Sequence, residues 1–203
     1  MSIWREPRSL ILASQSRARQ ALLAGAGFGF ESIPAEIDER AVQQMSRLSA
    51  PGEIASLLAR EKASWVAARR AGHYVVGADQ TLALGDRLFN KPRDRAQAVE
   101  QLRILSGRRH ELHSAVAVVR DEQIVFEHVS VAGMTMRSLR ETEIASYVEE
   151  AGERVVTSSV GAYQLEGLGV HLFDRIEGDH FTILGLPLLP LLGFLRSRGL
   201  LAL

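Results

Sequence analysis

Short apolar runs alternate with amphipathic stretches along the chain, and this pattern predicts an α/β protein. Residues 9–13 form an apolar run typical of a buried strand. Ser14 or Ser16 can cap a helix that stops near residues 25–27, where two glycines occur. Residues 28–33 indicate a second strand, and residues 54–71 place apolar side chains on one helical face.

The second half of the chain continues this alternation. Strands are expected at residues 73–78, 112–120 and 124–137, with a tight hairpin between residues 81–84 and 87–89. Asp94 with Gln97, and Ser138 with Glu141, have the spacing of capping boxes that open two helices. Short strands and turns are expected at residues 161–179, and a last helix at residues 187–196. One long hairpin among alternating helices and strands predicts a mixed sheet with flanking helices.

One acid stands out in the apolar stretch VVGADQTLAL, residues 75–84. Burying a carboxylate is costly unless the group is paired, hydrogen-bonded or bound to a metal ion. As a structural residue, Asp79 would need a cationic partner or backbone donors. As a functional residue it would lie at a strand end, where α/β sheets present their sites, and could bind metal or activate water.

Composition narrows the class of protein. The 203 residues carry 24 Lys+Arg against 24 Asp+Glu, so no net field favours nucleic-acid polymers or acidic membranes. The absence of cysteine excludes disulfides and thiol catalysis. The N-terminal stretch lacks the long apolar region of a signal peptide, and residues 183–195 are too short to span a bilayer. We therefore expect one cytoplasmic domain over residues 1–203, without membrane or nucleic-acid partners.

Polar residues near the ends of predicted elements are candidates for a site. Ser14 and Arg19 lie in a turn before a helix, where hydroxyls, free N–H groups and a guanidinium suit an anion. The alternative is a capped helix with solvated arginines. Asp38 and Glu39 could hold Mg²⁺ through oxygen ligands, or they could form a solvated turn.

Two lysines complete the candidate set. Lys62 lies at the edge of an apolar helical face, where it either covers the core or directs its charge into a pocket. Lys91 precedes a proline after the predicted hairpin, and a solvated turn is its alternative. The chain contains no P-loop, no strand-linked G-x-G-x-x-G, no H-E-x-x-H and no G-x-S-x-G. Kinases, P-loop ATPases, Rossmann dehydrogenases and the common hydrolase classes are therefore less favoured.

Taken together, these residues resemble the Maf family of nucleoside triphosphate pyrophosphatases. The blocks that carry the resemblance occur in the family's order: LILASQSRARQALL, EIDE, AREKA, VVGADQ, NKP, LRILSGRRHELHSAVAV, GAYQLEGLGVHLFDRIEGD and GLPLLPLL. The resemblance implies a mixed α/β fold in two lobes around a cleft, similar to that of inosine triphosphate pyrophosphatases.

The resemblance also implies an activity and roles for single residues. The implied reaction is hydrolysis between the α and β phosphates of a nucleotide, with a divalent cation such as Mg²⁺, Mn²⁺ or Co²⁺. A homodimer is an expectation of the same kind. Position by position, Asp79 matches the catalytic acid and a metal ligand. The other matches are phosphate-binding Ser14, Arg19, Lys62 and Lys91, and the metal ligands Glu39 and Asp38.

The branch that acts on 7-methyl-GTP is indicated by Gln80 after the acid and by Glu166 in YQLEGLG. The dTTP/UTP branch tends to have threonine after the acid and glutamine-glycine where this chain has Glu166-Gly167. The chain departs from the family turn S-x-S-P-x-R, since Arg17 replaces the proline and Ala18 replaces a larger residue linked to substrate choice. The set of Asp79, Lys62, Lys91 and Arg19 favours a housecleaning enzyme against modified nucleotides, since pure binding does not require a positioned acid. The alternatives are a nucleotide-binding regulator of cell division and septum formation, a dTTP/UTP-type enzyme, and a structural α/β module.

Overall fold

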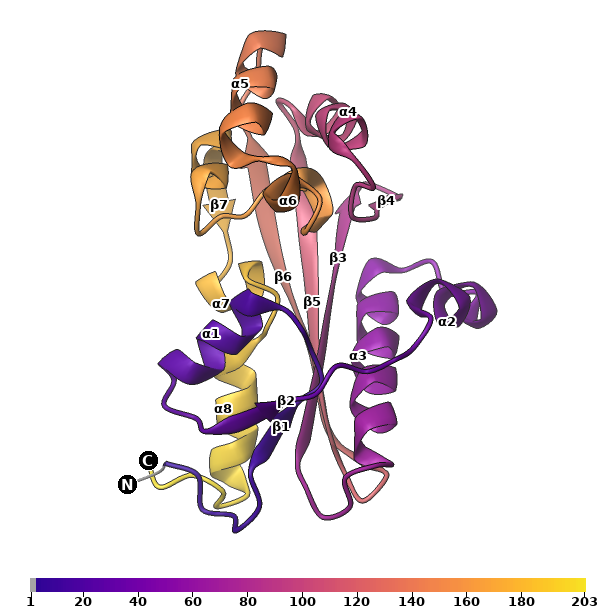
Figure 1. Cartoon of the computed structure of the whole chain (residues 1–203), viewed down its shortest axis with the longest axis vertical. Coiled ribbons are helices and arrows are strands. Elements are labelled where there is room, and N and C mark those ends of the chain that lie inside the picture. The colour runs from indigo at the N-terminus through magenta and orange to yellow at the C-terminus, as the bar shows by residue number, and fades with distance from the viewer. Residues whose placement is uncertain (1–2) are drawn as a thin grey trace. The chain divides into compact units, whose positions relative to one another are not determined.

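The computed structural model describes residues 3–203, so residues 1 and 2 of the expected single domain lie outside the described part. The described chain divides into two compact units, and its fold is the predicted mixed α/β architecture (Figure 1). The first unit consists of residues 3–80, 114–130 and 180–203, and the second of residues 81–113 and 131–179. The single-domain assignment stays a prediction.

The described residues form one seven-stranded sheet with the order β2-β1-β3-β5-β6-β7, and β4 pairs with β3. β1 pairs in parallel with β2 and β3, whereas the β3–β4 and β6–β7 pairs are antiparallel. The strands are β1 Leu10–Leu12, β2 Phe30–Ser32, β3 Val75–Leu84, β4 Arg87–Phe89, β5 Arg109–Arg120, β6 Gln123–Met136 and β7 Phe173–Glu177. Both kinds of pairing confirm the predicted mixed sheet.

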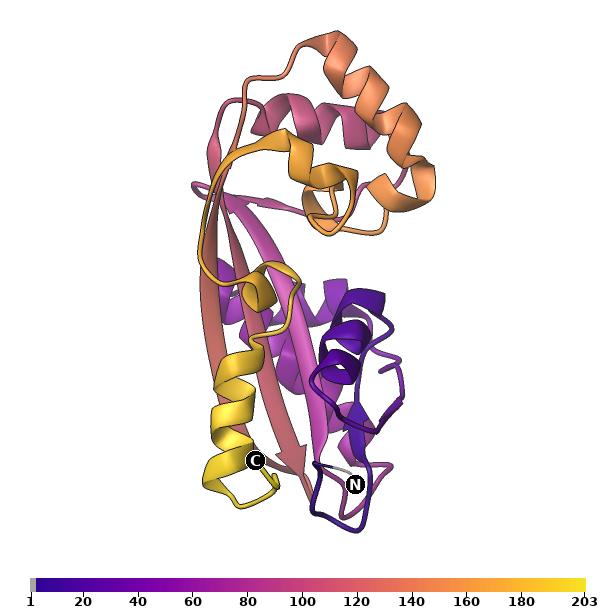
Figure 2. The same cartoon turned by 90° about the vertical axis from the view of Figure 1, so that its left-hand side faces the viewer.

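In the first unit, helices pack on both faces of β1 and β3. α1 (Arg17–Gly25) and α8 (Leu188–Ser197) cover one face, where Leu23, Leu191 and Leu195 pack on alternate strand residues. α3 (Pro51–Ala67) covers the other face through Ala63 and Val66. Figure 2, turned from Figure 1, places α8 in front of the strands and α3 behind them. The unit also contains α2 (Glu39–Ser46) and α7 (His180–Ile183).

The second unit has its own helical layer, in which α4 packs against α5 and η1. Leu102 of α4 and Ile144, Tyr147 and Val148 of α5 are buried. Its helices are α4 Arg95–Leu105, α5 Glu141–Ala151, α6 Glu153–Val156, and the 3₁₀ turns η1 Val160–Ala162 and η2 Leu168–Leu172. No helix within residues 3–203 is both long and apolar enough to cross a membrane.

Three sequence-based expectations about elements are wrong. The strand does not stop before Asp79, because β3 is continuous through it. α5 is capped by Arg140 rather than Ser138, since Glu143 Oε2 accepts the Arg140 backbone N–H at 2.8 Å. The segment after Asp38 is a helix, α2, rather than the solvated turn given as one alternative for Asp38 and Glu39.

Candidate active site

The first element of the site is the middle of β3. β1 ends at Leu12, one residue after its first pairing with β3 at Ile11, so β3 continues without this neighbour beyond Val76. Asp79 is the fifth of ten residues in β3 and only 7% of it is exposed. The predicted strand-end position is therefore wrong. Asp79 nevertheless lies where β3 has an open edge, because the neighbouring strand β1 is shorter.

A glycine lets helix α3 approach β3 closely at this point. A Cβ on Gly77 would lie 2.1 Å from the Ala59 carbonyl oxygen and 2.9 Å from the Ala63 Cβ. Side chains alternate along a strand, so Gly77 and Asp79 face the same helix. Lys62 follows Ala59 by almost one helical turn and therefore reaches the acid. The close contact between α3 and β3 at Gly77 therefore sets the distance between Lys62 and Asp79.

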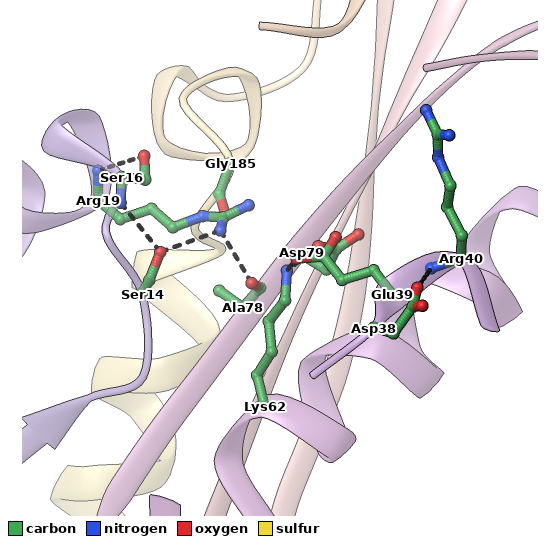
Figure 3. A network of polar contacts seen from close by, with 10 residues as sticks. All are labelled: Ser14, Ser16, Arg19, Asp38, Glu39, Arg40, Lys62, Ala78, Asp79 and Gly185. Atoms are coloured by element: carbon green, nitrogen blue, oxygen red, sulfur yellow. Dashed lines mark hydrogen bonds and ion pairs between the residues drawn. The ribbon is translucent and has the colours of Figure 1, made fainter. Parts of the chain in front are cut away.

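Lys62 links two carboxylates, as Figure 3 shows. Its Nζ donates to Asp79 Oδ1 at 2.6 Å and lies 2.8 Å from Glu39 Oε1. Lys62 is 9% exposed, so its charge is directed inward rather than into solvent. Of the two alternatives left by the sequence, the structure favours a charge pointing into a site over cover for the core.

Asp38 and Glu39 stand at the start of α2 but have different contacts. Asp38 Oδ1 accepts the backbone N–H groups of Arg40 and Ala41 at 3.1 and 3.0 Å, so Asp38 caps the helix. Glu39 is the first residue of α2 and turns toward Lys62. Lys62 joins Glu39 to Asp79, whereas Asp38 is engaged with the backbone N–H groups of α2.

Arg19 is held beside the open edge of β3. Ser16 caps α1, with its hydroxyl accepting the Arg19 backbone N–H at 3.5 Å. The guanidinium donates through Nη1 to the Ala78 carbonyl at 2.8 Å and to Ser14 Oγ at 3.3 Å, and through Nε to the Gly185 carbonyl at 2.7 Å (Figure 3). The Ala78 carbonyl follows that of Val76, which bonds to Ala13. Arg19 thus takes over from β1 as the partner of this strand edge.

Burial and charge act against each other in this cluster. Burial raises the pKa of Asp79, and the nearby charges of Lys62 and Arg19 partly oppose that rise. Burial likewise lowers the pKa of Arg19, against the attraction of Asp79 and Glu39. A carboxylate with a raised pKa is a better proton acceptor than an exposed one. The site therefore holds a basic carboxylate between two cations.

The residues also fit a divalent cation. Asp79 and Glu39 direct carboxylate oxygens at one point, now taken by the Lys62 ammonium, which shows that this point suits a positive charge. No group of three or more His, Cys, Asp or Glu side chains among residues 3–203 could hold a metal ion alone. Mg²⁺ commonly binds through one or two carboxylates together with water and substrate phosphates. Two carboxylates suit that mode.

Gln80 faces the side of the sheet opposite to Asp79. Its Nε2 donates to Ser114 Oγ at 2.8 Å and to the carbonyls of Thr182 and Ile183 at 3.1 Å each. Ser114 also donates to the Thr182 carbonyl at 2.7 Å. The amide therefore ties β3 to β5 and to the end of α7, and the predicted role of Gln80 in base selection stays a prediction.

The remaining candidates are not part of this cluster. Ala18 is half-buried in the first turn of α1. Lys91 is exposed two residues after β4, and Glu166 is exposed in the turn between η1 and η2. Both belong to the second unit, and their predicted roles with phosphate and base stay predictions.

Comparison with known proteins identifies the family of this chain. A family model described as "Maf-like protein" matches residues 9–198. The chain belongs to the Maf family. A relative named "Nucleoside triphosphate pyrophosphatase" from Rhodopseudomonas palustris (strain HaA2) is 65% identical over the full length of both chains. A "7-methyl-GTP pyrophosphatase" from Rhizobium etli is 55% identical over 94% of this chain and 96% of its own.

Among solved structures, a HAM1 protein from Coxiella burnetii matches 63% of this chain and 72% of its own, with a TM-score of 0.41 and 20% identity. This likeness is too low to support an inference. The Maf assignment rests on the family model and on the full-length relatives.

The sequence did not identify every residue that builds the site of this Maf chain. Gly77 and Gly185 were missed, as was Ser114. A glycine shortly after a helix is the sequence signal of a C-terminal cap, and Gly185 has the positive φ, +86°, of such a position. Its contact with Arg19 joins residues 166 positions apart, which no local pattern predicts.

Proposed function

We propose that this chain hydrolyses the α–β phosphate bond of 7-methyl-GTP, and of related modified nucleotides, to a nucleoside monophosphate and pyrophosphate. That it is a nucleoside triphosphate pyrophosphatase follows from its Maf membership and from full-length relatives of that name. The choice of 7-methyl-GTP is supported by the relative of that name at 55% identity. The cytoplasm, where free nucleotides occur, is the expected location.

The buried contact between Asp79 and Lys62 is the observation that carries the chemistry. The carboxylate lies within 2.6 Å of an ammonium that phosphate oxygens would compete for. When a triphosphate enters, Lys62 turns toward it, and Asp79 is released to take a proton from a water molecule. The water then attacks the α-phosphorus in line with the leaving pyrophosphate. Arg19, Lys62 and Lys91 offset the charge that builds on the leaving group.

A divalent cation fits this proposal as the cofactor. Asp79 and Glu39 would hold it, with Asp38 as the weaker candidate because its Oδ1 caps α2. Such an ion would neutralise phosphate charge and polarise the phosphorus–oxygen bonds. The residues of the chain supply the rest: Arg19 orients the phosphates and Asp79 accepts the proton.

Glu166 is the proposed residue for base selection, together with Gln80 and Ala18. The 7-methylguanine ring is positively charged, and its Watson–Crick edge presents N–H donors. A carboxylate can accept two of these hydrogen bonds and offset the charge, which a neutral amide cannot do. Glu166→Gln should therefore lose more activity on 7-methyl-GTP than on UTP. An unchanged ratio of kcat/KM for the two nucleotides removes Glu166 from base recognition.

A nucleotide panel tests the whole proposal. Pyrophosphate release is measured for 7-methyl-GTP, GTP, dTTP and UTP, each with Mg²⁺, Mn²⁺ or Co²⁺. In heavy-oxygen water, attack at the α-phosphorus labels the nucleoside monophosphate, whereas label in the pyrophosphate contradicts that mechanism. Preference for dTTP and UTP would place the chain in the other branch. Tight nucleotide binding without pyrophosphate release would favour the nucleotide-binding regulator.

A further inference from the structure

The end of α7 and the turn after it contact two of the candidate residues. The Thr182 and Ile183 carbonyls, at the end of α7, accept from Gln80, and the Gly185 carbonyl in the turn accepts from Arg19. Carbonyls at the end of a helix can accept hydrogen bonds from other elements. The end of α7 and the turn after it therefore provide acceptors that hold side chains from α1 and β3.

Three donor contacts account for the Arg19 atoms Nε and Nη1. Nε donates to the Gly185 carbonyl, and Nη1 donates to the Ala78 carbonyl and Ser14 Oγ. Nη2 donates to no acceptor within the described residues, 3–203. Guanidinium groups have five N–H donors in a rigid fork, so two donors on one nitrogen are left over. The three anchored bonds fix the direction in which that nitrogen points.

Gly185 meets two requirements that another residue could not meet together. Its φ of +86° is in the left-handed region, which glycine adopts without strain. This conformation closes the turn, with the Gly185 N–H donating to the Thr182 carbonyl at 3.0 Å. A Cβ at this position would lie 3.2 Å from Arg19 Nη2 and 3.3 Å from Arg19 Nε. The side chain that is absent would therefore press on the guanidinium itself.

We propose that Gly185 is a positioning residue for the substrate phosphates, acting through Arg19. Its carbonyl and its missing side chain hold the guanidinium so that Nη2 is left for a phosphate oxygen. This inference rests on the proposed function, because it assumes that a triphosphate binds at Arg19. The Gly-Leu-Pro segment, residues 185–187, thereby has a role in substrate binding in addition to forming the turn.

Gly185→Ala is the test, and Gly199→Ala is its matched control. Gly199 also follows a helix with a positive φ, +68°, but a Cβ there meets nothing within 4 Å. Both variants strain the backbone, and only Gly185→Ala presses on Arg19. Calorimetry with a non-hydrolysable α,β-methylene analogue of 7-methyl-GTP measures binding without turnover. We expect Gly185→Ala to weaken binding on the order of 10-fold or more, and Gly199→Ala to leave it unchanged.

The same substitution in an Arg19→Ala background separates positioning from a general structural effect. If Gly185 acts through Arg19, then Gly185→Ala causes no further loss of binding once Arg19 is removed. An equal loss in both backgrounds, or equal binding by the Gly185→Ala and Gly199→Ala variants, overturns the inference.

A second variant covers the case in which Gly185→Ala does not fold. Arg19→Lys keeps the charge but lacks the fork that meets the Gly185 and Ala78 carbonyls, and it should bind the analogue as weakly as Arg19→Ala. Binding by Arg19→Lys at the wild-type level overturns the inference. If the wild-type protein itself binds no analogue, the proposed function fails together with the inference. If the wild-type protein binds the analogue and a variant does not behave as expected, only the inference fails.

Discussion

The contact between α3 and β3 at Gly77 should control both stability and activity. In Gly77→Ala the new Cβ would stand 2.1 Å from the Ala59 carbonyl oxygen, whereas ordinary contact begins near 3.4 Å, so α3 has to retreat by roughly 1.3 Å. The two nearest atoms, the Ala59 carbonyl oxygen and the Ala63 nitrogen, belong to the backbone and cannot turn aside. Overpacking of this kind costs about 1–3 kcal/mol of folding free energy, and we expect a value at the upper end.

Activity should fall further than stability, because α3 carries Lys62. A retreat of this size opens the 2.6 Å contact between Lys62 Nζ and Asp79 Oδ1. A misplacement of about 1 Å in a catalytic group can cost on the order of 100-fold in rate. We expect kcat/KM of Gly77→Ala to fall by roughly that factor at a temperature where the variant is folded.

Urea unfolding and steady-state kinetics measure the two effects. Gly29→Ala is the matched control, because a Cβ on Gly29 meets nothing within 4 Å and its φ is not positive. The control should keep wild-type activity and stability. If Gly77→Ala behaves like Gly29→Ala in both measurements, the close approach of α3 does not position Lys62 and the reasoning is refuted.

Three further predictions concern single residues. Burial lowers the pKa of His110 from 6.5 to about 4, so below pH 6.5 the unfolded chain binds more protons than the folded one. The free energy of unfolding therefore decreases as the pH falls from 6.5 toward 4. At pH 4.5 this loss should be roughly 2–3 kcal/mol in urea unfolding and absent in His110→Gln; equal pH dependence of the two proteins contradicts it. Gly193→Ala, inside α8 with nothing within 4 Å of its Cβ, should raise the unfolding free energy by about 0.5–1 kcal/mol, and a lower value would show hidden contacts. Asp38→Asn should keep the cap of α2 and near-wild-type activity, whereas a large loss of metal-dependent activity would make Asp38 a metal ligand.

Elements with a buried face could be predicted from the sequence, because their apolar residues recur with the period of a helix or a strand. α3 and α8 follow from their apolar positions, and α1 from its serine cap. α2 was missed because it is short and has no buried residue. The cap of α5 was misplaced because Glu143 bonds back to Arg140, a residue type that rarely caps helices.

The structure brings the candidates Asp79, Lys62 and Glu39 together, but the sequence could not predict their geometry. Asp79 was found because a carboxylate in an apolar run needs a partner, and Lys62 proved to be that partner. The sequence could not show that β3 continues through the acid while β1 ends beside it, since strand pairing joins segments that are distant in the chain. Contacts between distant segments, such as Arg19 with Gly185, leave no periodic signal.

Pyrophosphate release from 7-methyl-GTP by wild type and by Asp79→Asn, with Mg²⁺ present, tests the central claim most directly. Asparagine keeps the shape of the side chain, and Glu39 still pairs with Lys62, so circular dichroism should show the same fold. Loss of a general base typically costs about 100- to 10,000-fold in rate. We predict a fall of that order in kcat for Asp79→Asn. Pyrophosphate release within a few-fold of wild type by a folded Asp79→Asn protein would contradict the claim that Asp79 activates the attacking water.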